Sequence, residues 1–147
     1  LQPSHAFFGE KDAQQLCVVK QMVHDLNFNL DIMPCPTVRE KSGLALSSRN
    51  EYLSTASREK ATVIYNGLNL GENALNNGER NPKKIKEIIE LHISKEPLAE
   101  IIYISVADSE SLKEVEGRIE KDVLVSLAVD FDGARLIDNF TYSSSGT

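Results

Sequence analysis

The hydrophobic positions in the first quarter of the chain predict one helix and one strand. Within residues 11–26, apolar side chains recur every three or four positions, which is the spacing of one helical face. The run 28–35 alternates apolar and polar residues and meets two prolines, Pro34 and Pro36. Alternation predicts a strand, and the prolines stop regular pairing and mark a hinge. We interpret this helix and strand as the last piece of an α/β sheet.

The middle of the chain predicts a long loop followed by two amphipathic helices. Residues 37–50 are polar, contain glycine and show no period. A helix over 54–76 begins at a good N-cap, Ser54, and ends before an Asn-Gly stop signal. Asn81 caps the next helix, with a proline at its first position and isoleucines at helical spacing, and Pro97 closes it.

The last third of the chain changes to strand patterning. Residues 101–106 predict a strand, and 109–115 predict a short helical turn. Two further apolar runs, 123–131 and 134–142, are joined by Asp-Gly, which is a hairpin signal. Their nearly continuous apolar character indicates a sheet that the two helices cover on at least one face. The polar tail, 143–147, is expected to fray.

These elements predict an α/β chain whose C-terminal part is α+β. We expect two regions: residues 1–36, which hold the last piece of an α/β sheet, and residues 37–147, a second unit with strands and helices. A chain of 147 residues with 41% hydrophobic residues can form a real core.

Composition and charge exclude several classes of function. The formal net charge of −6 argues against general nucleic-acid binding, which needs a basic face. No apolar run approaches the length of a membrane span, and the start of the chain lacks the pattern of a signal peptide. Cys17 and Cys35 are isolated and without metal-ligand spacing, so we interpret them as small apolar residues of a cytoplasmic protein.

One candidate anion site lies where the first helix should begin. Lys11 and Asp12 follow Gly9 directly, and a helix start offers free amides and the positive end of the dipole. Lys11 can pair with a phosphate, and Asp12 can order a ribose or position Lys11. Gln15 lies one turn further on the same face and is a candidate for binding a small polar substrate.

The second candidate site is in the long polar loop. Ser47, Ser48 and Arg49 supply two hydroxyls and a planar guanidinium, which suit a polyphosphate. A mobile loop of this kind can close over a triphosphate and stabilise a leaving pyrophosphate. Arg39 and Lys41 are expected to face water. Two phosphate-seeking segments on an acidic chain favour a nucleotide enzyme.

The remaining polar candidates are interpreted as structural. His5, His24 and His92 are scattered without ligand spacing, and a catalytic base among them is not favoured. Asp138 follows an apolar strand and is expected to be a polar strand end or a buried, hydrogen-bonded corner.

Four motifs together resemble the pantothenate synthetase (pantoate–β-alanine ligase) family. They are FFGEKDAQQL at 7–16, PTVREKSGLALSSRNEYL at 36–53, GER at 78–80 and ARLIDN at 134–139. The resemblance covers essentially the whole chain. It implies a cytoplasmic ligase with a nucleotide-binding fold like that of class I aminoacyl-tRNA synthetases. Such an enzyme activates pantoate with ATP and Mg²⁺ to pantoyl adenylate and pyrophosphate, and β-alanine then attacks, giving pantothenate and AMP.

The resemblance also assigns roles to matching residues of this chain. Lys11, Ser47, Ser48 and Arg49 would be catalytic, the last three within a counterpart of the KMSKS loop. Gln15 would bind pantoate. The residues that would bind ATP are Gly9, Glu10, Lys11, Asp12, Val38, Leu46, Ser47, Ser48 and Arg49.

The resemblance implies that this chain is a C-terminal half, with residues 1–36 as the remnant of a Rossmann-like nucleotide-binding domain and residues 37–147 as a smaller lid domain with a short antiparallel sheet and helices. Family members are close to twice as long, and the histidines of their HxGH-like motif do not occur in these 147 residues. The ligands of Mg²⁺ and most of the homodimer interface would lie in that other half. We therefore expect the chain to be inactive alone. The alternatives are a non-catalytic lid or interaction domain, and another class I-like nucleotidyltransferase.

Overall fold

The computed structural model describes residues 2–144 and divides the chain into two compact units, Leu1–Val38 (unit 1) and Arg39–Thr147 (unit 2). Unit 1 contains a two-stranded parallel sheet, and unit 2 contains a three-stranded antiparallel sheet. No helix in residues 2–144 is both long enough and apolar enough to span a membrane. The predicted mixture of helices with two kinds of sheet is confirmed.

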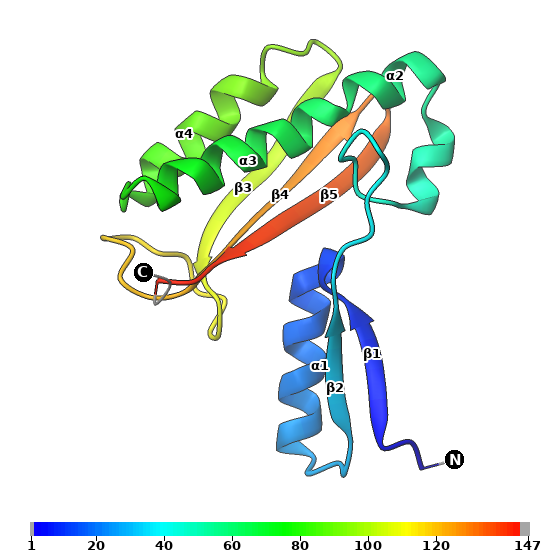
Figure 1. The fold of residues 1–147 in the computed structure, drawn as a ribbon, viewed down its shortest axis with the longest axis vertical. Coiled ribbons are helices and arrows are strands. Elements are labelled where there is room, and N and C mark those ends of the chain that lie inside the picture. Colours follow the sequence, from blue (N-terminus) through cyan, green and yellow to red (C-terminus); the bar gives the residue numbers. More distant parts are fainter. Residues whose placement is uncertain (1, 145–147) are drawn as a thin grey trace. The chain divides into compact units, whose positions relative to one another are not determined.

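Unit 1 is a strand–helix–strand segment (Figure 1). Its elements are β1 (His5–Gly9), the 3-10 turn η1 (Glu10–Asp12), α1 (Ala13–Asp25) and β2 (Asp31–Cys35). The two strands run parallel, with the first residue of β1 opposite the first of β2. The predicted helix and strand are both present, and each is shorter than its apolar pattern.

The sequence analysis missed strand β1. Its five residues contain adjacent phenylalanines, Phe7 and Phe8, so they lack the alternation that marks a strand. The strand exists through its pairing with β2, which lies beyond α1 in the chain. The helix starts later than predicted because Asp12 has a non-helical backbone and no capping hydrogen bond from its side chain.

Unit 2 packs two helices on one face of its sheet (Figure 1). The strands β3 (Ala99–Asp108), β4 (Val123–Phe131) and β5 (Ala134–Tyr142) lie in the order β3-β4-β5. Helix α3 (Thr62–Asn76) packs on α4 (Pro82–Ile93) and β5, and α4 packs on β3. The core fills the space between them because apolar positions of all five elements face inward.

The hairpin of β4 and β5 has the predicted bounds. Asp132 and Gly133 have φ values of 52° and 83°, the left-handed pair that a two-residue type I′ turn requires. The turn is also tied to helix α2 (Thr55–Lys60), since Ser57 donates to the Asp132 carboxylate at 2.5 Å. The two-residue turn at Asp132 and Gly133 fixes the register of this hairpin.

The two predicted N-caps, Ser54 and Asn81, are confirmed, but one predicted helix is divided in two. Ser54 accepts from the amide of Ser57 at 3.1 Å, and Asn81 accepts from the amide of Lys83 at 3.0 Å. The single helix expected over 54–76 is, however, two helices, α2 (Thr55–Lys60) and α3, that meet at the buried Ala61. The apolar spacing continues across this break, so periodicity does not reveal it.

Two expectations for the last third were wrong. The segment 109–115 is a hydrogen-bonded turn and not helical, because the Asp108 carboxylate takes the amide of Ser111 at 2.7 Å and Leu112 has a left-handed φ of 56°. The start of the tail is held, since Ser144 donates its amide to Asp122 at 2.8 Å. The rest of the tail, 145–147, lies outside the described residues.

Candidate functional site

The first predicted site lies at the carboxyl end of β1. Gly9 is the last residue of this strand, and the next three residues form η1, which leads into α1. Lys11 is half-buried, whereas Asp12 and Gln15 are exposed. The structure therefore brings residues 9–12 together in one turn and places Gln15 on the first turn of the helix. Val38, the last residue of unit 1, has 66% of its surface exposed.

The second predicted site is in the loop that opens unit 2. Its first part is a tight turn, in which Glu40 and Leu44 are joined by a backbone hydrogen bond of 2.9 Å and Arg39 pairs with Ala45 in a β-bridge. Gly43 has a φ of +92°, and a Cβ at this position would lie 2.1 Å from the ring of Tyr65. Only glycine satisfies both the backbone and this close approach.

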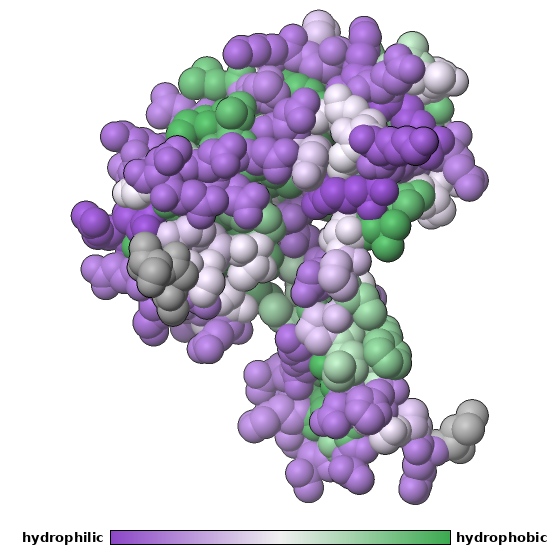
Figure 2. Space-filling model, in the orientation of Figure 1, coloured by the Kyte–Doolittle hydropathy of each residue, from purple (hydrophilic) through white to green (hydrophobic). Residues whose placement is uncertain are grey.

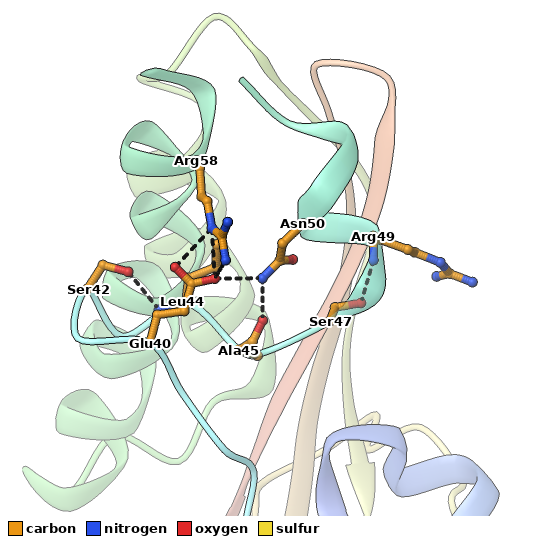
Figure 3. Close-up of polar contacts among 8 residues, drawn as sticks. All are labelled: Glu40, Ser42, Leu44, Ala45, Ser47, Arg49, Asn50 and Arg58. Carbon is orange, nitrogen blue, oxygen red and sulfur yellow. Dashed lines mark hydrogen bonds and ion pairs between the residues drawn. The ribbon is translucent and has the colours of Figure 1, made fainter. Parts of the chain in front are cut away.

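Glu40 is the centre of the polar network inside this loop (Figure 3). Its carboxylate accepts from Arg58 Nε and Nη2 at 2.9 and 2.7 Å and from Asn50 Nδ2 at 2.9 Å. The hydrogen bond with Arg58 is the main reason that the pKa of Glu40 is lowered. Asn50 Nδ2 also donates to the carbonyl of Ala45 at 3.0 Å. The network ties the start, middle and end of the loop to helix α2.

Arg39 does not face water, so that expectation was wrong. Its Nη1 and Nη2 donate to the two carboxylate oxygens of Asp138 at 2.6 and 2.9 Å, and Nη1 also donates to the carbonyl of Gly43 at 3.1 Å. The guanidinium lies over the ring of Tyr65, 4.6 Å from its centroid. Burial opposes the charge of Arg39, but its pairing with Asp138 outweighs burial and the pKa of Arg39 is raised.

Asp138 is the buried, hydrogen-bonded corner that was one of the two structural interpretations of the sequence. Only 3% of the surface of Asp138 is exposed. Lys41, which was expected to face water, is exposed. A fully desolvated carboxylate that meets a guanidinium through two parallel hydrogen bonds is a strong and directional contact. It joins the loop to strand β5.

Ser47, Ser48 and Arg49, which the sequence predicts to bind phosphate, lie at the end of this anchored loop. Ser47 Oγ accepts from the amide of Arg49 at 3.2 Å and thereby caps the 3-10 turn η2 (Ser48–Tyr52). Leu46, Ser48 and Arg49 are exposed. Figure 3 shows the Arg49 side chain pointing away from the Glu40–Arg58 pair. Its Nη1 donates to the carbonyl of Arg135 on β5 at 3.3 Å.

The structure thus gathers the predicted residues into two sets. Residues 9–12, with Gln15, form one set in unit 1, and residues 46–49 form the other in unit 2. In the second set, Ser48 and the guanidinium of Arg49 are exposed, and the half-buried Ser47 caps the turn that carries them. That arrangement can bind an anion such as a phosphate group without first ordering the loop.

No metal site accompanies these two sets. Within residues 2–144, no group of three or more His, Cys, Asp or Glu side chains is placed to hold an ion. Cys17 and Cys35 are both half-buried. The acids that do cluster near the loop, Glu40 and Asp138, are each paired with an arginine.

The GER motif at 78–80 has a structural role in unit 2. Arg80 donates to the carbonyl of Leu75 at 2.6 Å and to the hydroxyl of Tyr142 at 2.7 Å, and its guanidinium lies 5.1 Å from the centroid of that ring. Gly78 has a φ of +95°, which ends helix α3.

The sequence analysis missed the residues that hold the loop in place. Arg39, Glu40, Asn50 and Arg58 had been given no role in anchoring the loop. A signal was present for the first of these, since Arg39 and Asp138 each stand beside apolar residues in separate motifs. A charge in apolar surroundings requires a partner, and the two charges are opposite.

Comparisons with known proteins place these motifs in a family. The family model described as pantoate-beta-alanine ligase matches residues 1–141. The pantothenate synthetase of Clostridium acetobutylicum is 52% identical over 141 residues, which are 96% of this chain and 50% of that protein. That of Enterococcus faecalis is 55% identical over 137 residues, covering 93% of this chain and 48% of the relative.

Solved structures give the same result. The crystal structure of pantothenate synthetase from Thermus thermophilus matches with a TM-score of 0.88 and 39% identity, over 95% of this chain and 50% of that one. The pantoate-beta-alanine ligase from Francisella tularensis, complexed with beta-gamma ATP and beta-alanine, matches with a TM-score of 0.62 and 32% identity, over 95% and 44%. The chain spans about half the length of the curated relatives it matches.

Proposed function

Because the chain belongs to the pantoate–beta-alanine ligase family, we propose that it is the C-terminal half of a pantothenate synthetase. In this proposal residues 1–36 are the end of a Rossmann-like nucleotide-binding domain and residues 37–147 are the lid domain. The parallel strand–helix–strand arrangement of unit 1 supports the first assignment, and the complete core of unit 2 supports the second.

The proposed reaction has two steps. A carboxylate oxygen of pantoate attacks the α-phosphorus of ATP, an O–P bond forms, and pyrophosphate leaves. The amine of β-alanine then attacks the acyl carbon of the adenylate, loses a proton, and releases AMP as the amide forms. Negative charge develops on the phosphates in the first step, so fixed cationic and hydrogen-bonding groups lower its barrier.

Both residue sets contribute to ATP binding in this proposal. Lys11 pairs with the phosphates as a point charge, next to Gly9, Glu10 and Asp12. Ser47, Ser48 and Arg49 bind the phosphates with hydroxyls and a planar fork. Val38 and Leu46 complete the ATP contacts, and Gln15 binds pantoate. The described residues gather no acidic ligands for Mg²⁺, so we derive no step through that ion.

The observation that carries the proposal is the Ser47–Arg49 segment on an anchored base. Ser48 and Arg49 are exposed and Ser47 is half-buried, while Arg39 and Glu40 fasten the same loop to β5 and α2. The loop is therefore anchored within unit 2, and its candidate phosphate ligands stand on a base that the sheet and α2 hold.

A titration of the chain with ATP tests the assignment. A lost charge-assisted hydrogen bond weakens binding by roughly 10- to 100-fold, so we expect that loss for Arg49→Ala. Lys41→Ala is the matched control, because it removes a cation from the same loop at a position outside the proposed site, and it should leave the dissociation constant within about twofold. Equal losses in the two variants would contradict the assignment.

We also propose that the 147-residue chain does not catalyse the ligation alone. The chain spans half the length of its relatives, and the HxGH-like motif that the resemblance assigns to the first step is not among its residues. Removal of one transition-state donor typically costs about 10²–10³ in rate. Release of AMP from ATP, pantoate and β-alanine at a rate near that of a full-length relative would refute this.

A second candidate function is a lid or interaction module without catalysis. The observation in its favour is that unit 2 has a core of its own. In that case ATP binds in the millimolar range or not at all, and Arg49→Ala changes nothing. Micromolar binding that depends on Arg49 favours the ligase half.

A further inference from the structure

The buried ion pair of Arg39 and Asp138 joins the loop of unit 2 to strand β5. Its carboxylate is 3% exposed, and both guanidinium nitrogens that face it donate hydrogen bonds. The cost of burying two charges largely offsets their attraction, so such a pair is weak evidence for a role in stability. Removal of one partner leaves the other charge buried and unpaired.

Arg39 controls the course of the loop. It sits at the first position of unit 2, donates to the carbonyl of Gly43 and pairs with Ala45 in a β-bridge. The carbonyl of Ala45 in turn accepts from the side chain of Asn50. The hydrogen bond between Asn50 and Ala45 thereby joins η2 to the β-bridge.

The same strand holds both ends of this arrangement. Asp138 on β5 binds Arg39, and the carbonyl of Arg135 on β5 accepts from Arg49. These two positions of β5 are separated by about 10 Å along the strand. Strand β5 lies beside the central strand β4, which is the more buried of the two strands.

We propose that Arg39 and Asp138 are positioning residues, which fix the Ser47–Arg49 segment against strand β5 and so set its phosphate contacts. What the segment binds rests on the proposed function. The geometric part does not, because it concerns only the loop and the strand. Loss of the pair frees the loop at its start, and the hydrogen bonds of η2 then open more often than those of the sheet.

Amide hydrogen exchange of the intact chain tests the geometric part. The reporters are the amides of Asn50 and Leu53, which donate within η2 at 3.0 and 3.2 Å. In Asp138→Asn, which keeps the size and removes the charge, exchange of these amides should rise about tenfold more than exchange of the β4 amides. Arg39→Lys keeps the charge but loses the planar fork, and the same selective rise is expected.

Arg80→Lys is the matched control. Arg80 also lies over a tyrosine and bonds to β5, through Tyr142, but it is not part of the loop. Its replacement should raise exchange of the β4 amides at least as much as exchange of the η2 amides, because a general loss of stability acts most on amides that open only with global unfolding. If Asp138→Asn and Arg39→Lys behave like this control, the positioning role is overturned.

The titration with ATP separates the two proposals. If Arg49→Ala leaves ATP binding unchanged, the proposed function fails, and the exchange result still decides whether the pair holds the segment. If Arg49→Ala weakens binding and Asp138→Asn does not, the pair does not set the phosphate contacts. Weakening in both variants, with selective exchange in η2, is the expected result.

Discussion

Unit 2 buries a continuous set of apolar side chains, whereas unit 1 leaves most of its apolar side chains in contact with solvent. In residues 2–38 the one buried side chain is Leu16. Figure 2 shows hydrophobic surface on this part of the chain. Its exposed large apolar residues are Phe7, Val18, Met22, Leu26, Phe28, Met33 and Val38. A periodic apolar pattern predicts a face but not the surface that covers it.

Size explains much of this difference. A segment of fewer than about 40 residues rarely forms a core without disulfides, metals or partners, and two strands alone are marginal. Unit 2 has three strands and two long helices around one core. We therefore expect unit 1 to depend on surfaces outside it, and to favour self-association when they are absent.

The largest expected effect is in the local stability of the two units. Amides of Val125 and Leu127 in the centre of β4 should exchange at least about 10³-fold more slowly than amides of α1, since core strands open only with global unfolding. Hydrogen exchange of the intact chain followed by NMR measures this. Similar protection in both units would remove the distinction between them.

Truncation of one core side chain in each unit should give the next largest effect. Ile89 is fully buried against α3, so Ile89→Ala should lower the free energy of unfolding of unit 2 by about 2–5 kcal/mol. Leu16→Ala should change the same transition by less than about 0.5 kcal/mol, because the site lies in the other unit. Urea unfolding followed by circular dichroism compares them. A large loss in Leu16→Ala would show that the two units unfold together.

Helix caps provide a smaller contrast. Asn81 caps α4 through its side chain, so Asn81→Ala should cost about 1 kcal/mol. Asp12 occupies the same position before α1 but makes no capping hydrogen bond with its side chain. The Asp12→Ala variant should therefore leave the urea midpoint unchanged. A matching loss in the two variants would mean that the ends of α1 and α4 are equally well capped.

The smallest expected effect is the acid sensitivity of the loop in unit 2. The pKa of Glu40 is lower in the folded chain than in the unfolded one, mainly because Arg58 donates hydrogen bonds to it. Its contribution is thus present above the unfolded pKa and is lost as the pH falls through the folded pKa. The melting temperature should drop more between pH 7 and pH 3 in the wild type than in Glu40→Gln. Parallel curves would contradict this role.

The sequence predicted best what depends on neighbouring residues. The hairpin turn needs two residues with positive φ, and Asp132-Gly133 provides them, so both strand ends were placed correctly. The caps at Ser54 and Asn81 also act within three residues. Strand β1 depends on a partner that follows a whole helix, and its short apolar run carries no period of its own.

The site shows the same division between local and distant information. Residue types at 47–49 indicated an anion-binding segment, and in the structure Ser48 and Arg49 are exposed and Ser47 is half-buried. Their role in binding ATP stays a prediction. The sequence carried a weak signal for the fastening of the loop, two opposite charges beside apolar residues, but it could not specify the pair, because Arg39 and Asp138 are 99 positions apart in the chain. Opposite charges in separate motifs do not by themselves specify a pair.

The stacking of Arg39 on Tyr65 gives the molecule a native optical label. The chain contains four tyrosines and no tryptophan, so tyrosine dominates its near-ultraviolet signal. A guanidinium held 4.6 Å from a ring centroid makes the surroundings of that ring asymmetric. Release of the arginine would therefore alter near-ultraviolet circular dichroism, and movement of the loop can be followed without any attached dye.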